Sequence, residues 1–136
     1  MRIYDDLVIE SSRDKLEELL LDTEFPWYFV KRSSGAAPKI DAFVDCPQLV
    51  HKFIDDDKIS SNHIHEVMRL LNWENILSVT GAPERIIRMK TNLLLKTQNT
   101  PNTPHIDYPD PHIVMLYYVN DSSGPTTFYN RKFKVK

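Results

Sequence analysis

Cysteine and long apolar runs are scarce in this chain, and each shortage excludes a class of protein. One cysteine, Cys46, occurs among the 136 residues, so no internal disulfide can form. Cys46 precedes Pro47, has no evident base beside it, and is interpreted as a small buried apolar residue. This usage fits a reducing compartment. No apolar run approaches the roughly 20 residues of a membrane-spanning helix, so no membrane partner is expected.

An excess of charge of one sign is also missing. The formal net charge is -2 at pH 7, so no overall field attracts nucleic acid or an anionic membrane surface. Nucleic acid is therefore not expected as a partner. Residues 1–12 contain acids where a signal peptide has its apolar run, so secretion is not expected and a cytoplasmic location is predicted.

What is present is an ordinary globular composition. The chain has 41% hydrophobic and 26% charged residues, and its 136 residues predict a single domain, 1–136, with a modest core. We expect residues 1–80 to form a helical and mixed supporting region and residues 81–136 to form a mostly β half. Helices followed by strands indicate the α+β class.

Two segments, 11–23 and 62–72, have the amphipathic periodicity of helices, and each begins with residues that can cap one. The apolar stripe of the first contains Leu16, Leu19 and Leu20, and that of the second contains Ile64, Val67, Met68 and Leu71. Asn62 is the candidate cap of the second helix. His63 and His65 are two residues apart on it, so they point in different directions and are not expected to share a metal ion.

The remaining segments are read as strands or left open. Residues 25–30 are aromatic and extended, which predicts a strand. The pattern of residues 47–54 is ambiguous, and a short helix is the assignment considered for it. Residues 84–97 alternate as a strand does, with Arg88, Lys90 and Asn92 on one face. That polar face is either solvated or lines a pocket that takes an anion, which makes Asn92 a candidate pocket-lining residue.

A histidine and an aspartate lie two residues apart before a long apolar stretch. We expect short strands at 105–107 and 112–120 and a further strand at 126–136, and residues i and i+2 of a strand share a face. His105 and Asp107 would then project together as a mixed donor set suited to Fe(II), Mn(II) or Zn(II). Two ligands rarely hold a divalent ion firmly, so a third is expected. The alternative is a histidine that hydrogen-bonds a carboxylate at a strand end.

The residues around this pair resemble the iron- and 2-oxoglutarate-dependent dioxygenases, in the prolyl hydroxylase-like branch with its short phage and bacterial proteins. In that family the H-x-D precedes an apolar strand ending in Tyr-Tyr-Leu/Val-Asn, a turn with glycine and a Thr-x-Phe strand. The matching residues are His105, Asp107, Leu116, Tyr117, Tyr118, Val119, Asn120, Gly124, Thr126 and Phe128. The clear resemblance covers roughly residues 85 to 130.

The resemblance implies a double-stranded β-helix, or jelly roll, with supporting helices packed outside it. It also implies that His105 and Asp107 bind Fe(II), that Tyr118 hydrogen-bonds 2-oxoglutarate, and that an unidentified substrate is hydroxylated with O2 to give succinate and CO2. Strand parity places His112 and Leu116 on the face of Tyr118, so both are candidate pocket-lining residues.

The sequence departs from the family pattern after this point. Relatives have a distal histidine on a later strand and a basic residue shortly after it, whereas the last histidine here is His112. We expect a C-terminally truncated chain with an incomplete jelly roll. The alternatives are a degenerate relative and a site closed by His112. An incomplete jelly roll would expose a sheet edge, through which the chain would self-associate.

Two other functions fit the same residues. A non-catalytic jelly-roll module could bind a ligand or partner and keep His105 and Asp107 as a vestige of a lost iron site. A cupin-like hydrolase or isomerase would bind metal without 2-oxoglutarate. The tyrosine pair and the Thr-x-Phe strand favour the dioxygenase family, by resemblance alone.

Overall fold

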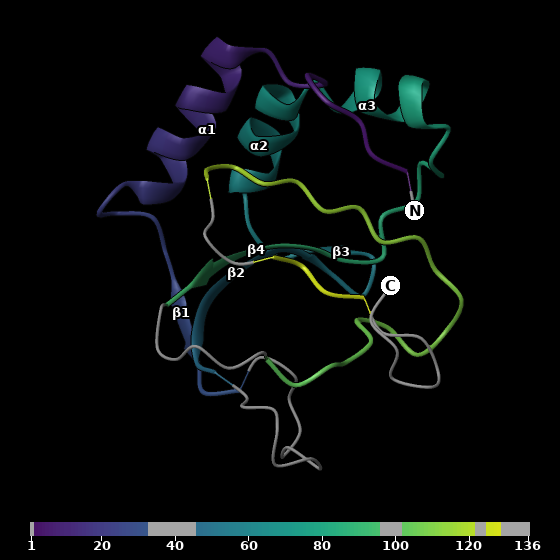
Figure 1. Ribbon diagram of the computed structural model, residues 1–136. Helices are drawn as coiled ribbons and strands as arrows, with labels where there is room; N and C mark the ends of the chain where they lie inside the picture. Colours follow the sequence, from purple (N-terminus) through teal and green to yellow (C-terminus); the bar gives the residue numbers. More distant parts are fainter. Residues whose placement is uncertain (1, 33–45, 96–101, 122–124, 129–136) are drawn as a thin grey trace.

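The computed structural model describes residues 2–32, 46–95, 102–121 and 125–128 (Figure 1). This part of the chain contains three helices and a four-stranded antiparallel sheet. The elements are α1 (Glu10–Leu21), β1 (Tyr28–Val30), β2 (Gln48–Asp55), β3 (Lys58–Ile59), α2 (His63–Leu71), α3 (Trp73–Thr80) and β4 (Met89–Leu94). The predicted α+β class is confirmed.

Strand β2 is the centre of the sheet. It pairs antiparallel with β1, β3 and β4. Because β1 and β4 both pair with residues 48–50, they lie along opposite edges of β2. An irregularity between Lys52 and Ile54 shifts the register with β4, as a β-bulge does. In the described part of the chain β4 is the outer strand on its side.

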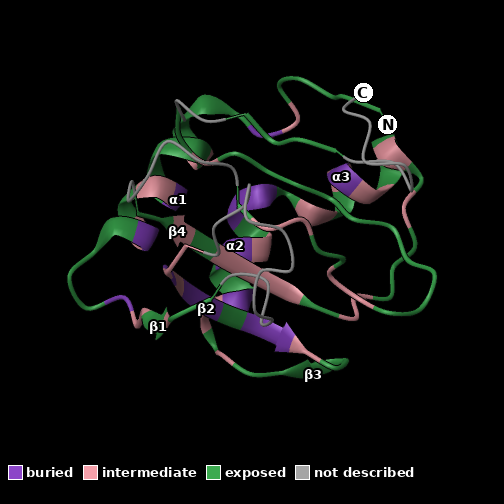
Figure 2. Ribbon diagram, turned by 60° about the horizontal axis from the view of Figure 1, so that its bottom comes forward, coloured by how far each residue is buried: buried purple, intermediate pink, exposed green. Residues whose placement is uncertain are grey.

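The helices lie together on one side of the sheet (Figure 1). The core fills the space between, and its most buried large side chains are Leu16 of α1, Phe53 of β2 and Ile64 of α2. Figure 2 shows the buried residues gathered on β2 and on the helices. Within the described ranges, no helix covers the opposite face of the sheet. No helix of the described ranges is long and apolar enough to cross a membrane.

The two predicted helices are confirmed as α1 and α2, but their ends differ from the prediction. Helix α1 begins one residue before the serines, and Asn62 at the start of α2 makes no capping hydrogen bond with its side chain. Instead, the Oγ of Ser61 accepts the backbone N–H of His63 at 3.3 Å. Asn72 ends α2 in the left-handed conformation, φ 52°, and α3 follows at once. The sequence reading did not anticipate α3.

The short helix considered for residues 47–54 is wrong, because this segment is strand β2. Five of its eight residues are buried, and they lie on both faces. A strand that is buried on both faces loses the alternation by which strands are recognised in a sequence. The predicted strands at 25–30 and 84–97 are confirmed in shorter form as β1 and β4.

The strands expected at 105–107 and 112–120 are absent from the structure as described. Both segments run without sheet partners, and most of their side chains are exposed. A strand is stable only with a neighbour that satisfies its backbone groups, and these residues form no backbone ladder in the described part. The strand expected over residues 126–136 falls mostly outside the described ranges. The jelly roll itself stays a prediction.

Candidate functional site

The face of the sheet that turns away from the helices carries a group of polar side chains at the middle of β2 and β4. On β2, His51 and Phe53 pack against each other with ring centroids 4.8 Å apart, and Phe53 belongs to the helix-facing core. Lys52 lies between them and therefore points to the opposite face. Across the ladder Lys52 pairs with Lys90, and Asn92 follows two residues later on β4. We call Lys52, Lys90 and Asn92 the polar sheet face.

The two lysines of this face carry like charges at paired positions, which costs free energy unless the charges are compensated. Each ammonium has its own carboxylate. Lys52 Nζ donates to Asp55 Oδ2 at 2.6 Å, and Lys90 Nζ donates to Asp107 Oδ1 at 3.3 Å. Arg88 Nε lies 3.4 Å from Asp55 Oδ1. The pKa of Asp55 is lowered, first by the Lys52 hydrogen bond and further by the charges of Lys52 and Arg88, although burial acts in the opposite direction.

The segment with the predicted metal ligands is held against the start of β4. Arg88 Nη1 donates a hydrogen bond to the backbone carbonyl of Asp107 at 2.8 Å, and Lys90 Nζ donates one to the carboxylate of the same residue. The Arg88 guanidinium carbon also lies 5.8 Å from the centre of the Tyr108 ring, within the range of a cation–π contact. Asp107 is therefore fixed at the edge of the polar sheet face by both its backbone and its side chain.

His105 is exposed and makes a local hydrogen bond. Its Nδ1 lies 3.1 Å from the carbonyl oxygen of Thr103, and a carbonyl only accepts, so Nδ1 is the donor. In the neutral imidazole the lone pair is then on Nε2. A backbone carbonyl that accepts from Nδ1 selects this same tautomer in metal-binding histidines. His105 and Asp107 do not lie on a strand, so the parity argument that placed them on one face does not hold here.

The other predicted site residues are not gathered around Asp107. His112 donates from Nδ1 to the Asp110 carbonyl at 2.7 Å, and its ring meets the Tyr108 ring edge-on at 6.0 Å. Leu116 and Tyr118 are more than half exposed, and the Tyr118 hydroxyl hydrogen-bonds Thr126 Oγ1. Of the predicted pocket-lining residues, Asn92 lies on the polar sheet face and His112 near Tyr108.

Tyr118 belongs to a stretch that lies on the helix side of the molecule. Val119 packs against the core, and burial raises the pKa of Tyr117. Figure 1 shows residues 112–121 passing beside the helices, away from the sheet face that holds Asp107. The structure therefore does not bring Tyr118 to the predicted iron ligands. A role for Tyr118 there requires residues 112–120 to join the sheet as a strand.

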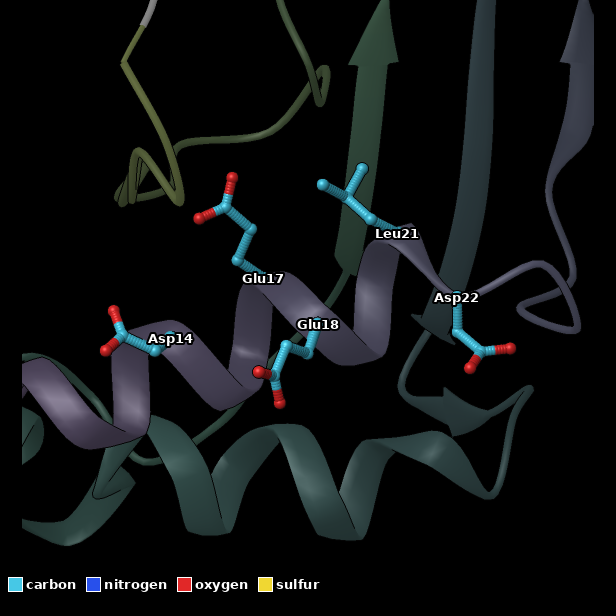
Figure 3. Close-up of a pocket in the computed structure, with 5 residues that line it drawn as sticks. All are labelled: Asp14, Glu17, Glu18, Leu21 and Asp22. Atoms are coloured by element: carbon cyan, nitrogen blue, oxygen red, sulfur yellow. The ribbon is translucent and has the colours of Figure 1, made fainter.

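The part of the chain that the structure describes offers no third metal ligand near the pair. Among the described residues, no three or more His, Cys, Asp or Glu side chains are grouped to hold a metal ion. A surface hollow on α1 is lined by Asp14, Glu17, Glu18, Leu21 and Asp22. Figure 3 shows that its carboxylates spread along the helix and do not converge. The acidic lining would also repel an anionic ligand such as 2-oxoglutarate.

One histidine outside the predicted site is buried in the core layer. His51 is 2% exposed, and its Nδ1 donates to the carbonyl of Pro26 at 2.7 Å. Its Nε2 has no partner among the described residues. The rings of Phe25 and His63 lie 4.7 and 5.7 Å away, centroid to centroid. His51 thus joins β2 to the chain before β1 inside an aromatic cluster, a structural role that only a strand assignment for residues 47–54 would have suggested.

Comparisons with known proteins add no family to this geometry. No protein-family model, curated protein or solved structure matches the chain. A functional assignment therefore depends on the His105-x-Asp107 pair, on the cations that hold it, and on the residue pattern that follows it.

Proposed function

We propose that the chain carries part of the iron site of a cytoplasmic Fe(II)- and 2-oxoglutarate-dependent dioxygenase. It would hydroxylate an unidentified substrate with O2 and release succinate and CO2. The observation that carries the proposal is the position of Asp107. The resemblance places supporting helices outside a jelly roll, so the site belongs on the sheet face that turns away from them. Asp107 lies at the edge of that face, bound to Lys90.

The donor chemistry of His105 and Asp107 supports their proposed role as two of the three protein ligands of a ferrous ion. His105 would bind the metal through Nε2, because its Nδ1 donates a hydrogen bond to the Thr103 carbonyl. Asp107 offers a carboxylate that is partly exposed, at 38% of its side chain, and so can be reached from solvent. Imidazole and carboxylate are the donors of non-haem Fe(II) oxygenase sites, where bound iron supplies the activation of O2. A third ligand would complete the site.

The charges around the pair favour an anionic cosubstrate. Arg88 and Lys90 place a guanidinium and an ammonium against Asp107. The cosubstrate 2-oxoglutarate has two carboxylates, and cations beside its site offset the loss of their hydration. Under this proposal Asn92, on the same strand face, lines the pocket. Under this proposal Tyr118 donates its phenol to 2-oxoglutarate, with Leu116 and His112 lining the pocket, once residues 112–120 pair as a strand.

The second candidate function is a non-catalytic binding module that has lost its iron site. Two observations favour it. The Asp107 carboxylate is already paired with an ammonium, and the described residues supply no group of three ligands. This alternative predicts a monodisperse domain whose stability and spectrum do not change when Fe(II) and 2-oxoglutarate are added.

An anaerobic titration with Fe(II) and 2-oxoglutarate separates the two functions. We expect a visible metal-to-ligand charge-transfer band for the unaltered chain and its loss in Asp107→Ala. Asp110→Ala is the matched control, because Asp110 is an exposed aspartate of the same segment that is not a predicted ligand. A band in the control but not in Asp107→Ala supports the iron site. Absence of a band in the unaltered chain, or its persistence in Asp107→Ala, rejects it.

A further inference from the structure

The peptide bond between Asp110 and Pro111 lies in an exposed bend of the chain. It is the single Asp-Pro pair of the sequence. An aspartate side chain can close a ring onto its own backbone carbonyl carbon, because carboxyl oxygens are nucleophiles. The nitrogen of proline belongs to a tertiary amide, which is a better leaving group than an ordinary peptide nitrogen once it is protonated. Chemically, this bond is therefore the most acid-labile peptide bond of the chain.

The carbonyl oxygen of this bond accepts a hydrogen bond from a histidine two residues further on. His112 Nδ1 lies 2.7 Å from the Asp110 oxygen, and since a carbonyl only accepts, Nδ1 is the donor. Nδ1 donates in this neutral tautomer and also in the protonated ring. A donor on the carbonyl oxygen stabilises the negative charge that develops there when the carbonyl carbon is attacked. His112 is thus placed as an oxyanion donor to the bond between Asp110 and Pro111.

The neighbouring side chains hold the imidazole and leave the carboxylate free. The His112 ring meets the Tyr108 ring edge-on with centroids 6.0 Å apart, and the Arg88 guanidinium carbon lies 5.8 Å from the centre of the Tyr108 ring. In the described part of the chain no cation or hydrogen-bond donor holds the Asp110 carboxylate, whereas Lys90 holds that of Asp107. The bend therefore combines a fixed donor with an unengaged nucleophile.

We propose that this bend is a self-cleavage site, at which Asp110 cuts its own bond to Pro111 with the help of His112. A carboxyl oxygen of Asp110 bonds to the Asp110 carbonyl carbon, the carbon–nitrogen bond to Pro111 breaks, and the proton of the carboxylic acid passes to the proline nitrogen. The products are a cyclic anhydride at Asp110 and a free amino terminus at Pro111. Water then opens the anhydride to the two carboxyl groups of a C-terminal aspartate.

Cleavage divides the chain between an anchored part and an exposed apolar part. Arg88 and Lys90 hold Asp107 at β4, so residues up to 110 stay with the sheet. The second fragment begins at Pro111 and carries four apolar side chains that are more than half exposed, Ile113, Val114, Leu116 and Tyr118. The reaction consumes only water, so this inference does not depend on the proposed function.

Mass spectrometry of the purified chain, incubated at mildly acidic pH without metal or 2-oxoglutarate, tests the proposal. We expect fragments 1–110 and 111–136, whose masses together exceed the intact chain by one water. Asp110→Glu keeps the carboxylic acid on a longer arm, which disfavours ring closure, and should stay intact over the same period. His112→Ala should slow cleavage about ten- to hundredfold. This is less than the roughly 100- to 1,000-fold loss at a buried oxyanion hole, because the bond is exposed to water.

Two controls separate the folded bend from general acid lability. His65→Ala removes an exposed histidine of α2 and should leave the rate unchanged. The unaltered chain in urea gives the rate of the same bond without the folded bend, and it should be slower than in the folded protein. Circular dichroism of each variant confirms that the fold has formed.

Each other outcome overturns part or all of the proposal. Equal rates for His112→Ala and the unaltered chain would reject the role of His112. A folded chain that stays intact, or that is cut no faster than in urea, would reject the site itself. A cut at another bond, or cleavage of Asp110→Glu at the rate of the unaltered chain, would reject attack by the Asp110 carboxylate. Failure here leaves the iron site untouched, because the assay contains neither iron nor cosubstrate.

Discussion

Replacing Phe53 with alanine tests the feature of the fold that the sequence reading missed, the central strand β2. Phe53 is 2% exposed and is among the most buried large side chains of the described residues. Its ring lies 4.8 Å from the His51 ring and 6.4 Å from the Phe25 ring, centroid to centroid. The side chain therefore fills the layer between β2 and the helices, where little else can move into the space it leaves.

The expected loss follows from that burial. Truncation of a buried phenylalanine to alanine removes the transfer free energy of the ring and leaves a cavity, which together cost about 3–5 kcal/mol. Because Phe53 has aromatic neighbours that are themselves packed, we expect a value of about 4 kcal/mol. Domains of this size are stable by about 5–15 kcal/mol, so the variant loses a large share of its stability.

Urea unfolding followed by tryptophan fluorescence measures this loss, since Trp27 and Trp73 both pack against the core. Phe29→Ala is the matched control. Phe29 lies on the neighbouring strand β1 but is 64% exposed, so its loss should cost at most about 0.5 kcal/mol. A cost below about 1 kcal/mol for Phe53→Ala, or equal costs for the two variants, would refute the packing of β2 beneath the helices.

Two further predictions concern the same sheet and the end of α3. The pKa of Asp55 is lowered from its ordinary value of 3.8, chiefly by the Lys52 hydrogen bond. Its stabilising contribution is therefore present above that value and is lost as the pH falls through the lowered pKa. We expect Asp55→Asn to cost up to about 1 kcal/mol at pH 7 and progressively less below about pH 4, measured by urea unfolding at both pH values. A difference that does not depend on pH would contradict the ion pair. Gly81 ends α3 at φ 65° with open space around its Cα, so Gly81→Ala should cost about 1 kcal/mol from backbone conformation alone, and a neutral result in thermal unfolding would refute the left-handed cap.

Local periodicity was sufficient for part of the fold. Helix α2 has an apolar stripe within a single amphipathic segment, and Ile64, Val67 and Leu71 of that stripe are buried as expected. The alternation of β4 also gave the correct faces, with Lys90 and Asn92 together on one side. These features depend on residues that are only a few positions apart. The regular repeat of a helix or a strand is enough to say which of those residues share a face.

The same reasoning failed where the environment hides the repeat. Strand β2 is covered on both faces, so its apolar residues do not alternate. Helix α3 follows α2 after a single left-handed residue, Asn72, which the sequence reading treated as the end of the helical segment. The parity argument for residues 105–107 and 112–120 failed for another reason, since these segments pair with no strand in the described part of the chain.

For the candidate site, too, some features follow from the sequence alone and others only from the fold. The sequence by itself determined that His105 and Asp107 are two residues apart and that a polar face runs along residues 88–92, and it left open whether that face is solvated or receives an anion. Only the tertiary structure showed that a carboxylate of the chain itself lies against this face. It belongs to Asp107, which is 17 residues after Lys90 in the sequence and accepts a hydrogen bond from its ammonium. Periodicity relates residues within one element, whereas a contact between a strand and a distant loop depends on how the whole chain folds around its core.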